Sequence, residues 1–476
     1  MSVDREALRD TAKYLRNARP VDPDEVYEYL PDRPHPAVVR TALREEAFGL
    51  GLFEREDGTF VPTNDDPVDP PGWSLEAFPD EHAEAIEDLL FERYGLDWHE
   101  GDSGDALRET IDRLKENYYR GRPVEYDADA ALAYAVYHQP DFYAAVGYVL
   151  DRLADRGLLP RTLRVLDVGA GTGGPAMGLH DYLPDDALVD YHAIEPTANA
   201  DVLDEVLEDT RPNFHTTVHR ETAEAFDPDE RAVDEVDLVL FGNVLSELDD
   251  PEAVVSRYLD ALAADGSCVL LAPADLNTST ELRRVERALT PPGGDVSVYA
   301  PDLRLWPGDV PSDRGWSFEE RPDLAVPSFQ RKLDDAATRA YDEEPGTYVN
   351  TDVKFSWVIL RPDGERRHPV VAGAERHHRM TDSEDHVTDR VNLLAVKLSD
   401  DLAPDDANPL FKVGDGSEQL EHYLVLTGES ALNRDLREAP YGAILSVENV
   451  LILWNDDEGA YNLVCGKETV VDMVAA

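Results

Sequence analysis

One short segment of the chain combines an acidic residue with glycines at alternate positions. Its candidate ligand-binding residues are Asp167, Gly169, Ala170, Gly171, Thr172 and Gly173. Glycines at these points permit a tight turn and a close approach of the backbone to a ligand, and the N–H groups of a following helix suit a carboxylate. A second acidic residue, Glu195, ends the next apolar stretch about 22 residues later and is placed to accept hydrogen bonds from ribose hydroxyls. The two features predict a pocket for a nucleoside cofactor that carries a carboxylate.

The spacing of the glycines distinguishes between two kinds of cofactor. Nicotinamide enzymes use G-x-G-x-x-G, whereas this chain has G-x-G-x-G preceded by Asp167, which resembles the class I methyltransferases. The resemblance implies S-adenosylmethionine as the cofactor, with Glu221 and Thr222 near its adenine and Asn243 facing the sulfonium and the substrate. The alternative is a degenerate site that keeps the fold and has lost the ligand.

Alternating apolar strands and helices from residue 164 to about 360 predict the element that positions these residues. The pattern is typical of an α/β domain with a mostly parallel, Rossmann-like sheet. Before it, three helices and a hairpin resemble a winged helix, and after it short strands separated by turns predict a small β-barrel, OB-like in type. The predicted domains are winged-helix-like (1–64), linker and helical segment (65–117), methyltransferase-like (118–361), basic polar linker (362–385) and OB-like barrel (386–476).

The charge balance of the 476 residues is extreme. Asp and Glu number 100 against 44 Lys and Arg, a net charge of -56. Multimolar salt screens such self-repulsion, so the composition indicates a halophile-like, salt-loaded cytoplasm; the alternative is an acidic chain that binds basic partners. No apolar run is long enough to span a membrane and the N-terminus does not resemble a signal peptide, so we expect a cytoplasmic protein without a membrane partner.

The catalytic residues stay unassigned. The segment Gly242-Asn243-Val244-Leu245 is not the Asn/Asp-Pro-Pro-aromatic turn of enzymes that methylate exocyclic base amines. Cys268 lies inside a predicted strand, where packing is a better explanation than nucleophilic attack, and Cys465 is in the barrel tail. Methyl transfer by proximity and orientation alone is therefore the mechanism that the sequence permits.

A longer resemblance covers about half of the chain. The segment AYAVYHQPDFYAAV (133–146), the loop LDVGAGTGGPAM (166–177) and DVKFSW (352–357) resemble methyltransferase-like assembly proteins of the small ribosomal subunit, known best from mitochondria, with archaeal relatives. The resemblance implies the small ribosomal subunit or its rRNA as partner. Members often hold an iron–sulfur cluster with four cysteines, but this chain has two, so we expect neither that cluster nor another metal site.

One basic tract stands out in this acidic chain. We predict that its arginines contact RNA phosphates: Arg361, Arg366, Arg367, Arg376 and Arg379. Phe411, Tyr423 and Trp454 of the barrel are possible base-stacking residues. The alternatives are arginines paired with the abundant carboxylates and aromatic rings buried in the barrel.

The sequence therefore predicts an S-adenosylmethionine-binding, methyltransferase-like protein that acts on or helps assemble the small ribosomal subunit. A small-molecule methyltransferase and a non-catalytic scaffold that senses S-adenosylmethionine are the alternatives. The acidic residues Glu45 and Glu46 beside Arg40 and Arg44 in the recognition-like helix argue against DNA binding.

Overall fold

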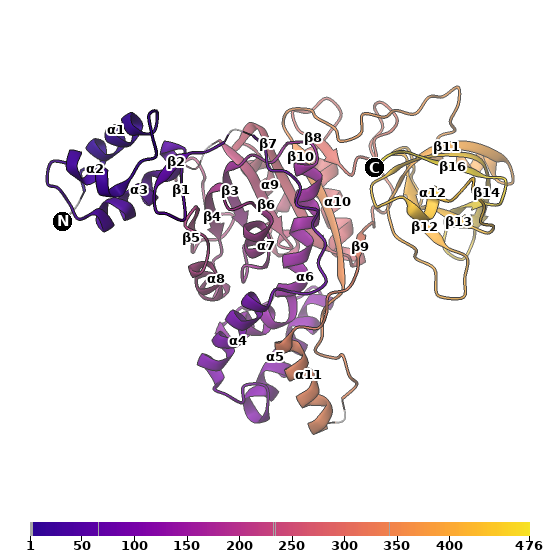
Figure 1. The fold of residues 1–476 in the computed structure, drawn as a ribbon. Helices are drawn as coiled ribbons and strands as arrows, with labels where there is room; N and C mark the ends of the chain where they lie inside the picture. The colour runs from indigo at the N-terminus through magenta and orange to yellow at the C-terminus, as the bar shows by residue number, and fades with distance from the viewer. Residues whose placement is uncertain (1–2, 65, 232, 234, 342) are drawn as a thin grey trace. The chain divides into compact units, whose positions relative to one another are not determined.

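The structure of the protein, a computed structural model, describes residues 3–64, 66–231, 233, 235–341 and 343–476. The chain forms two compact units, and Figure 1 labels their helices and strands. Unit 1 comprises Met1–Gly242 and Asp323–Val353, and unit 2 comprises Asn243–Pro322 and Lys354–Ala476. These limits differ from those of the five domains predicted from the sequence, and the five-domain division stays a prediction.

Unit 1 begins with a small helical module. The side chains of Asp4 and Asp22 accept backbone N–H groups and cap its first two helices. Arg40 and Arg44 of its third helix both pair with Glu54, so one carboxylate offsets part of their positive charge. The elements follow the predicted order: α1 (Arg5–Leu15), α2 (Pro23–Tyr29), α3 (Pro36–Leu50), β1 (Leu52–Glu54) and β2 (Phe60–Pro62).

A parallel sheet forms the centre of unit 1. Its strands read as continuous apolar runs because both faces of a parallel sheet are covered. The order is β5-β4-β3-β6, and every pairing is parallel. Helices α7 and α8 follow β3 and β4, as in βαβ units. The bounds are β3 (Thr162–Val168), α7 (Gly174–Tyr182), β4 (Leu188–Ile194), α8 (Asn199–Glu208), β5 (Phe214–His219) and β6 (Val236–Gly242).

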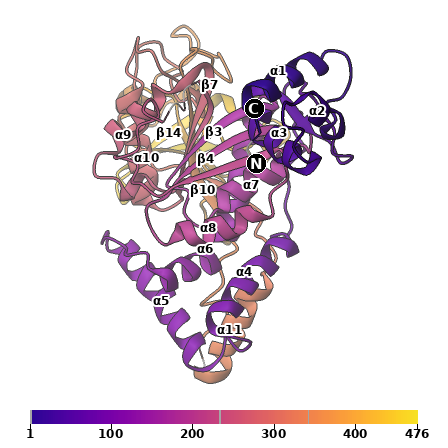
Figure 2. The ribbon, with the colours of Figure 1, turned by 90° about the vertical axis from the view of Figure 1, so that its left-hand side faces the viewer.

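The long helix α6 (Ala128–Ala154) packs against α7 beside the sheet. It begins at Asp127, whose side chain accepts the Ala130 N–H group. Helix α11 (Ser328–Tyr341) contacts both α4 (Asp80–Tyr94) and α5 (Gly101–Tyr119), although it lies far from them in sequence (Figure 2). In the part of the chain that the structure describes, no helix combines the length and the apolar character that crossing a membrane requires.

Unit 2 contains antiparallel strands that give the α/β region its mixed character. The order is β7-β10-β8, with β9 also paired to β10. Together with the parallel strands of unit 1, this agrees with the predicted α/β class. The bounds are η1 (Leu245–Glu247), α9 (Pro251–Leu259), β7 (Leu262–Pro273), α10 (Leu276–Leu289), β8 (Ser297–Ala300), β9 (Glu319–Arg321) and β10 (Val353–Arg361).

The C-terminal part of unit 2 is a closed five-stranded barrel, which confirms the predicted barrel. The strands follow the order β11-β12-β13-β15-β14, and β14 pairs back to β11; β13 and β15 are parallel. β16 adds to the barrel through β14. The bounds are η2 (Met380–His386), β11 (Arg390–Lys397), β12 (Leu410–Gly414), β13 (His422–Leu426), α12 (Asp435–Glu438), β14 (Ile444–Asn455), β15 (Ala460–Cys465) and β16 (Val470–Ala475).

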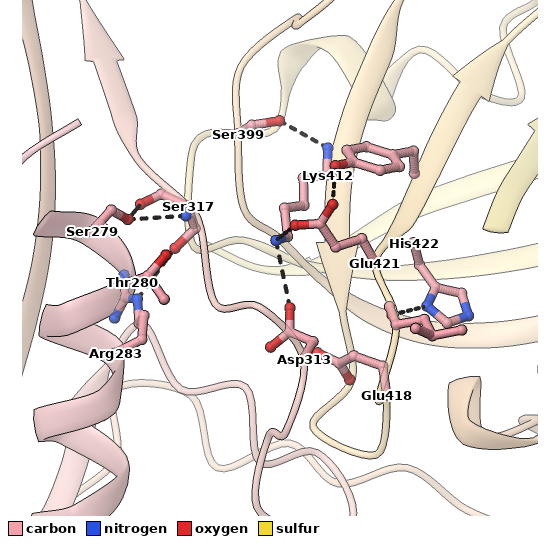
Figure 3. Close-up of polar contacts among 12 residues, drawn as sticks. Ser279, Thr280, Arg283, Asp313, Ser317, Ser399, Lys412, Glu418, Glu421 and His422 are labelled. Atoms are coloured by element: carbon pink, nitrogen blue, oxygen red, sulfur yellow. Dashed lines mark hydrogen bonds and ion pairs between the residues drawn. The ribbon is translucent and has the colours of Figure 1, made fainter. Parts of the chain in front are cut away.

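Buried polar contacts join the barrel to the rest of unit 2 (Figure 3). The Lys412 ammonium lies 3.5 Å from Asp313 and 3.1 Å from Glu421, and all three side chains are largely buried. The buried guanidinium of Arg283 on α10 donates to the Tyr441 hydroxyl at 2.8 Å. The barrel is therefore fixed to α10 and to the loop after β8 by charged groups that need their partners.

Glu418 makes the stability of this unit depend on pH. Burial and the neighbouring Asp415 and Asp313 carboxylates raise the pKa of Glu418 well above its usual value. A carboxyl whose pKa is raised on folding stabilises the native state at low pH, and that stabilisation is lost as the pH rises through the folded-state pKa. One carboxylate oxygen accepts the Asp415 and Gly416 N–H groups, which glutamine would also do.

We therefore expect Glu418→Gln to stabilise the protein at pH 8 and to change its stability little at pH 5. Thermal unfolding of both proteins at the two pH values measures this effect. If the two proteins differ in unfolding temperature by the same amount at pH 5 and at pH 8, the assigned role of Glu418 is contradicted.

Candidate functional site

The glycine loop leaves β3 and enters α7 through three left-handed backbone positions. The φ angles are 70° at Gly169, 57° at Gly171 and 93° at Gly173, a region that side chains disfavour. A Cβ atom on Gly173 would lie 2.9 Å from the side chains of Leu203 and Val206 on α8. Glycine is thus required both for the turn and for the packing of α8 against the loop.

Glu195 is bound directly to this loop. The Gly171 N–H group donates to one oxygen of the Glu195 carboxylate at 3.0 Å, and the backbone and hydroxyl of Thr197 donate to the other. Glu195 is 4% exposed. Each carboxylate oxygen has a further lone pair, so ribose hydroxyls can still be accepted. The structure therefore brings together the two features that the sequence singled out.

Asp167 lies fully buried at the end of β3. The Tyr191 hydroxyl donates to its Oδ2 atom at 2.6 Å, while Oδ1 is buried and has no hydrogen-bond partner among the described residues. Burial and the nearby Glu195 carboxylate raise the pKa of Asp167 to about 7, although the Tyr191 bond opposes the rise. A buried acceptor without a donor fits a cationic ligand group, and the α-ammonium of S-adenosylmethionine is one.

This raised pKa predicts a pH dependence of binding. An ammonium group favours ionised Asp167, so binding below pH 7 must first remove a proton from the carboxyl. We expect the Kd for S-adenosylmethionine to be more than about tenfold higher at pH 5.5 than at pH 7.5. Isothermal titration calorimetry at both pH values measures the ratio. Asp167→Asn should bind weakly and with a ratio near one, and a wild-type ratio that equals the variant's would contradict the assignment.

The other predicted cofactor residues have different surroundings. Ala170 is buried, and the Thr172 hydroxyl donates to Gln139 of α6 at 2.7 Å. Glu221 follows β5 and pairs with Arg231, and Thr222 is exposed, with its hydroxyl accepting the Ala225 N–H group at 3.3 Å. Their contact with adenine stays a prediction.

Asn243 is the first residue of unit 2, directly after β6. Its φ angle is 62°, which is uncommon for a residue other than glycine, and its N–H group donates to Leu271 O at 3.0 Å. Backbone strain of this kind clusters at functional sites. The predicted role of Asn243 toward the sulfonium is not tested by these contacts.

Sequence reasoning missed several residues of the site. Gln139 binds the glycine loop, Tyr191 orients Asp167, and the buried Oδ1 atom of Asn199 has no hydrogen-bond partner among the described residues. The one available signal was the density of aromatic residues from 134 to 143, which suggests packing as readily as ligand binding. Tyr191 and Asn199 give no signal, because a tyrosine in a strand and an asparagine at a helix start are ordinary.

The basic tract does not form a free row of arginines. Arg361 is 1% exposed and is bound to Asp363 and Ser267, so its guanidinium lies in the interior of this structure. Arg366 pairs with Asp302 and Arg379 pairs with Asp309, while Arg376 is exposed. The alternative prediction, arginines paired with carboxylates, therefore describes Arg361, Arg366 and Arg379. The backbone N–H group of Arg367 donates to Tyr299 O.

The two cysteines are both buried and unbonded. Burial raises the pKa of the Cys268 thiol far above its usual range, which opposes thiolate formation.

Comparisons with known proteins bear on this site. Residues 166–268 match a methyltransferase domain family. Residues 5–56 and 381–474 match the N-terminal and C-terminal domains of a family described as a domain of unknown function, DUF8157. No curated protein is significantly similar to the chain.

Several solved structures are similar to parts of the chain. The plantazolicin methyltransferase BpumL in complex with SAH is 12% identical over 58% of this chain and 98% of its own, with a TM-score of 0.31. The CurJ carbon methyltransferase is 18% identical over 56% and 71%, with a TM-score of 0.27. An S-adenosylmethionine-dependent O-methyltransferase from Thermotoga maritima is 14% identical over 45% and 61%, with a TM-score of 0.24.

The family match includes the glycine loop and Glu195. It confirms the methyltransferase part of the resemblance drawn from the sequence, whereas the ribosomal part stays a proposal. Residues 166–268 of this chain are therefore a methyltransferase domain by sequence similarity.

Proposed function

We propose that this protein transfers the methyl group of S-adenosylmethionine to a small-molecule acceptor. The observation that carries the proposal is the proximity of two acidic residues to the glycine loop. The Gly171 N–H group of this loop donates to Glu195, and Asp167, at the end of the strand before the loop, is held by the Tyr191 hydroxyl. S-adenosylmethionine supplies an electrophilic methyl group on a sulfonium, and the acceptor atom that takes this group gives up a proton. Binding and orientation of the two partners are the contribution that the protein makes.

Three groups around the glycine loop each suit one part of the cofactor. The N–H groups at the start of α7 suit the carboxylate, Asp167 suits the ammonium and Glu195 suits the ribose hydroxyls. A carboxylate that accepts ribose hydroxyls must be buried and oriented, and Glu195 is held by Gly171 and Thr197. These roles support cofactor binding independently of the acceptor.

The ion pairs of the basic tract favour a small acceptor over a nucleic acid. Arg361, Arg366 and Arg379 of that tract are each paired with a carboxylate. A nucleic acid would have to displace those carboxylates to contact these arginines. A small acceptor does not meet this obstacle.

Transfer of labelled methyl groups tests this proposal. The purified protein is incubated in multimolar KCl with S-adenosylmethionine carrying a radioactive methyl group and with the low-molecular-weight fraction of cells, or with their RNA. We expect label in small molecules and none with Glu195→Ala. Label in RNA alone, or no transfer to any fraction, would contradict the proposal.

Action on the small ribosomal subunit is a second candidate. It is supported by the strand order of the barrel, which is that of an OB fold, a fold that binds oligonucleotides. Trp454 is 39% exposed and Arg376 is exposed, whereas Phe411 is buried in the barrel core. We propose Trp454 and Arg376 as the RNA contacts of this candidate. Copurification of rRNA with the wild type, but not with Arg376→Ala plus Trp454→Ala, supports it.

We also propose three general properties of the protein. They are a winged-helix-like N-terminal domain (1–64), a cytoplasmic location and adaptation to a salt-loaded cell interior. The acidic composition supports the last of these, since salt screens repulsion among carboxylates. All binding measurements are therefore best made in multimolar KCl.

A further inference from the structure

Helix α6 carries aromatic rings across the glycine loop. A Cβ atom on Gly171 would lie 3.8 Å from the Tyr134 ring, and one on Gly174 would lie 3.1 Å from Phe142 Cβ. The Thr172 hydroxyl donates to Gln139 between these two aromatic residues, at 2.7 Å. The Tyr134 ring is thus held at van der Waals distance from the loop by contacts on the same helix.

The residues before α6 reach the second cofactor loop. The Ala198 N–H group donates to Tyr126 O at 3.4 Å, directly after Thr197, which binds Glu195. The rings of Tyr126 and Tyr134 meet edge to face, with centroids 5.5 Å apart and an interplanar angle of 86°. The backbone of Tyr126 thus contacts the turn that follows Glu195, while its ring contacts the Tyr134 ring, which lies near the Gly171 turn.

The chemistry of the cofactor indicates which of its atoms would lie near the rings of Tyr126 and Tyr134. In S-adenosylmethionine the sulfonium sulfur joins the methionine chain to the ribose. Because the glycine loop suits the methionine end and Glu195 suits the ribose, a group that lies between the two loops is close to the sulfur. An aromatic face attracts a cation, and the neighbouring carboxylates of Asp167 and Glu195 add to a negative potential.

We propose that Tyr134 is the ring that contacts the sulfonium, and that it makes the site distinguish S-adenosylmethionine from S-adenosylhomocysteine. S-adenosylhomocysteine, the demethylated product, has a neutral thioether and gains nothing from the ring's negative face. Tyr134 therefore favours the charged cofactor and helps the product leave. This inference rests on the proposed function, since it assumes the cofactor orientation given above.

Calorimetric titration with both ligands tests this role, using full-length wild type, Tyr134→Leu and Tyr134→Phe. We expect Tyr134→Leu to lower the ratio of Kd for S-adenosylhomocysteine to Kd for S-adenosylmethionine by about 3- to 30-fold. Tyr134→Phe keeps the ring and should keep the ratio. Sinefungin, which carries an ammonium-bearing carbon in place of the sulfonium, should follow S-adenosylmethionine.

Tyr137→Leu is the matched control, because Tyr137 lies on the same helix and its ring packs on His138 and the Lys115 ammonium. It should leave the ratio unchanged. If Tyr134→Leu does not fold, Tyr134→Met removes the ring with a side chain of adaptable shape. Equal losses for both ligands would overturn the role of Tyr134, whereas wild type that binds neither ligand would overturn the proposed function itself.

Discussion

We expect Glu195→Ala to weaken the binding of S-adenosylmethionine at least about 100-fold. The substitution removes the carboxylate that is placed to accept two ribose hydroxyls, and each hydrogen bond to a charged group is worth about 1.5–3 kcal/mol. It also releases the Gly171 N–H group and Thr197, which both donate to Glu195. Isothermal titration calorimetry in multimolar KCl measures the loss.

Two variants control for indirect effects of this change. Glu195→Gln keeps one accepting oxygen and should lose less affinity than alanine. Glu208→Ala removes an exposed carboxylate from the last residue of α8 and should bind like wild type. Unaltered binding by a folded Glu195→Ala protein would show that the ribose is held elsewhere.

We expect Lys412→Met to destabilise unit 2 by about 3 kcal/mol. Removal of one partner of a buried ion pair leaves the other charge uncompensated, which costs about 3–5 kcal/mol. Here Asp313 keeps its second partner, Arg287 at 2.8 Å, so the lower end of the range applies. Glu421, 3.1 Å from the ammonium, loses this cation as well.

Lys354→Met is the matched control for this substitution. Lys354 also belongs to unit 2 and pairs with Glu320 at 3.3 Å, but both side chains are more than a third exposed. Exposed ion pairs contribute about 0–1 kcal/mol, so its effect should be small. Chemical denaturation followed by circular dichroism measures both proteins, and equal destabilisation would contradict the importance of burial.

The parts of the site that the sequence predicted are local in the chain. The glycine loop is predictable because left-handed backbone positions require glycine wherever they occur. Glu195 is predictable because the ends of neighbouring parallel strands meet at one edge of the sheet. Barrel strands are recognisable from their alternation and turns, although the closure of β14 on β11 depends on pairing that no local pattern encodes.

The parts of the structure that the sequence does not reveal depend on partners far away in the chain. Arg361 has the basic neighbours that are typical of an RNA contact, yet Ser267, 94 residues away, helps hold it in the interior. The role of α6 over the glycine loop was likewise hidden, because an aromatic helix has the same sequence pattern whether it packs on a sheet or covers a ligand. Tertiary contacts decide between these outcomes.

The most direct test of the central claim is a calorimetric titration of the full chain with S-adenosylmethionine in multimolar KCl. The account predicts saturable binding at one site, competition by S-adenosylhomocysteine and loss of binding in Gly171→Arg, whose side chain conflicts with a φ angle of 57°. A folded wild-type protein that binds neither ligand would contradict it.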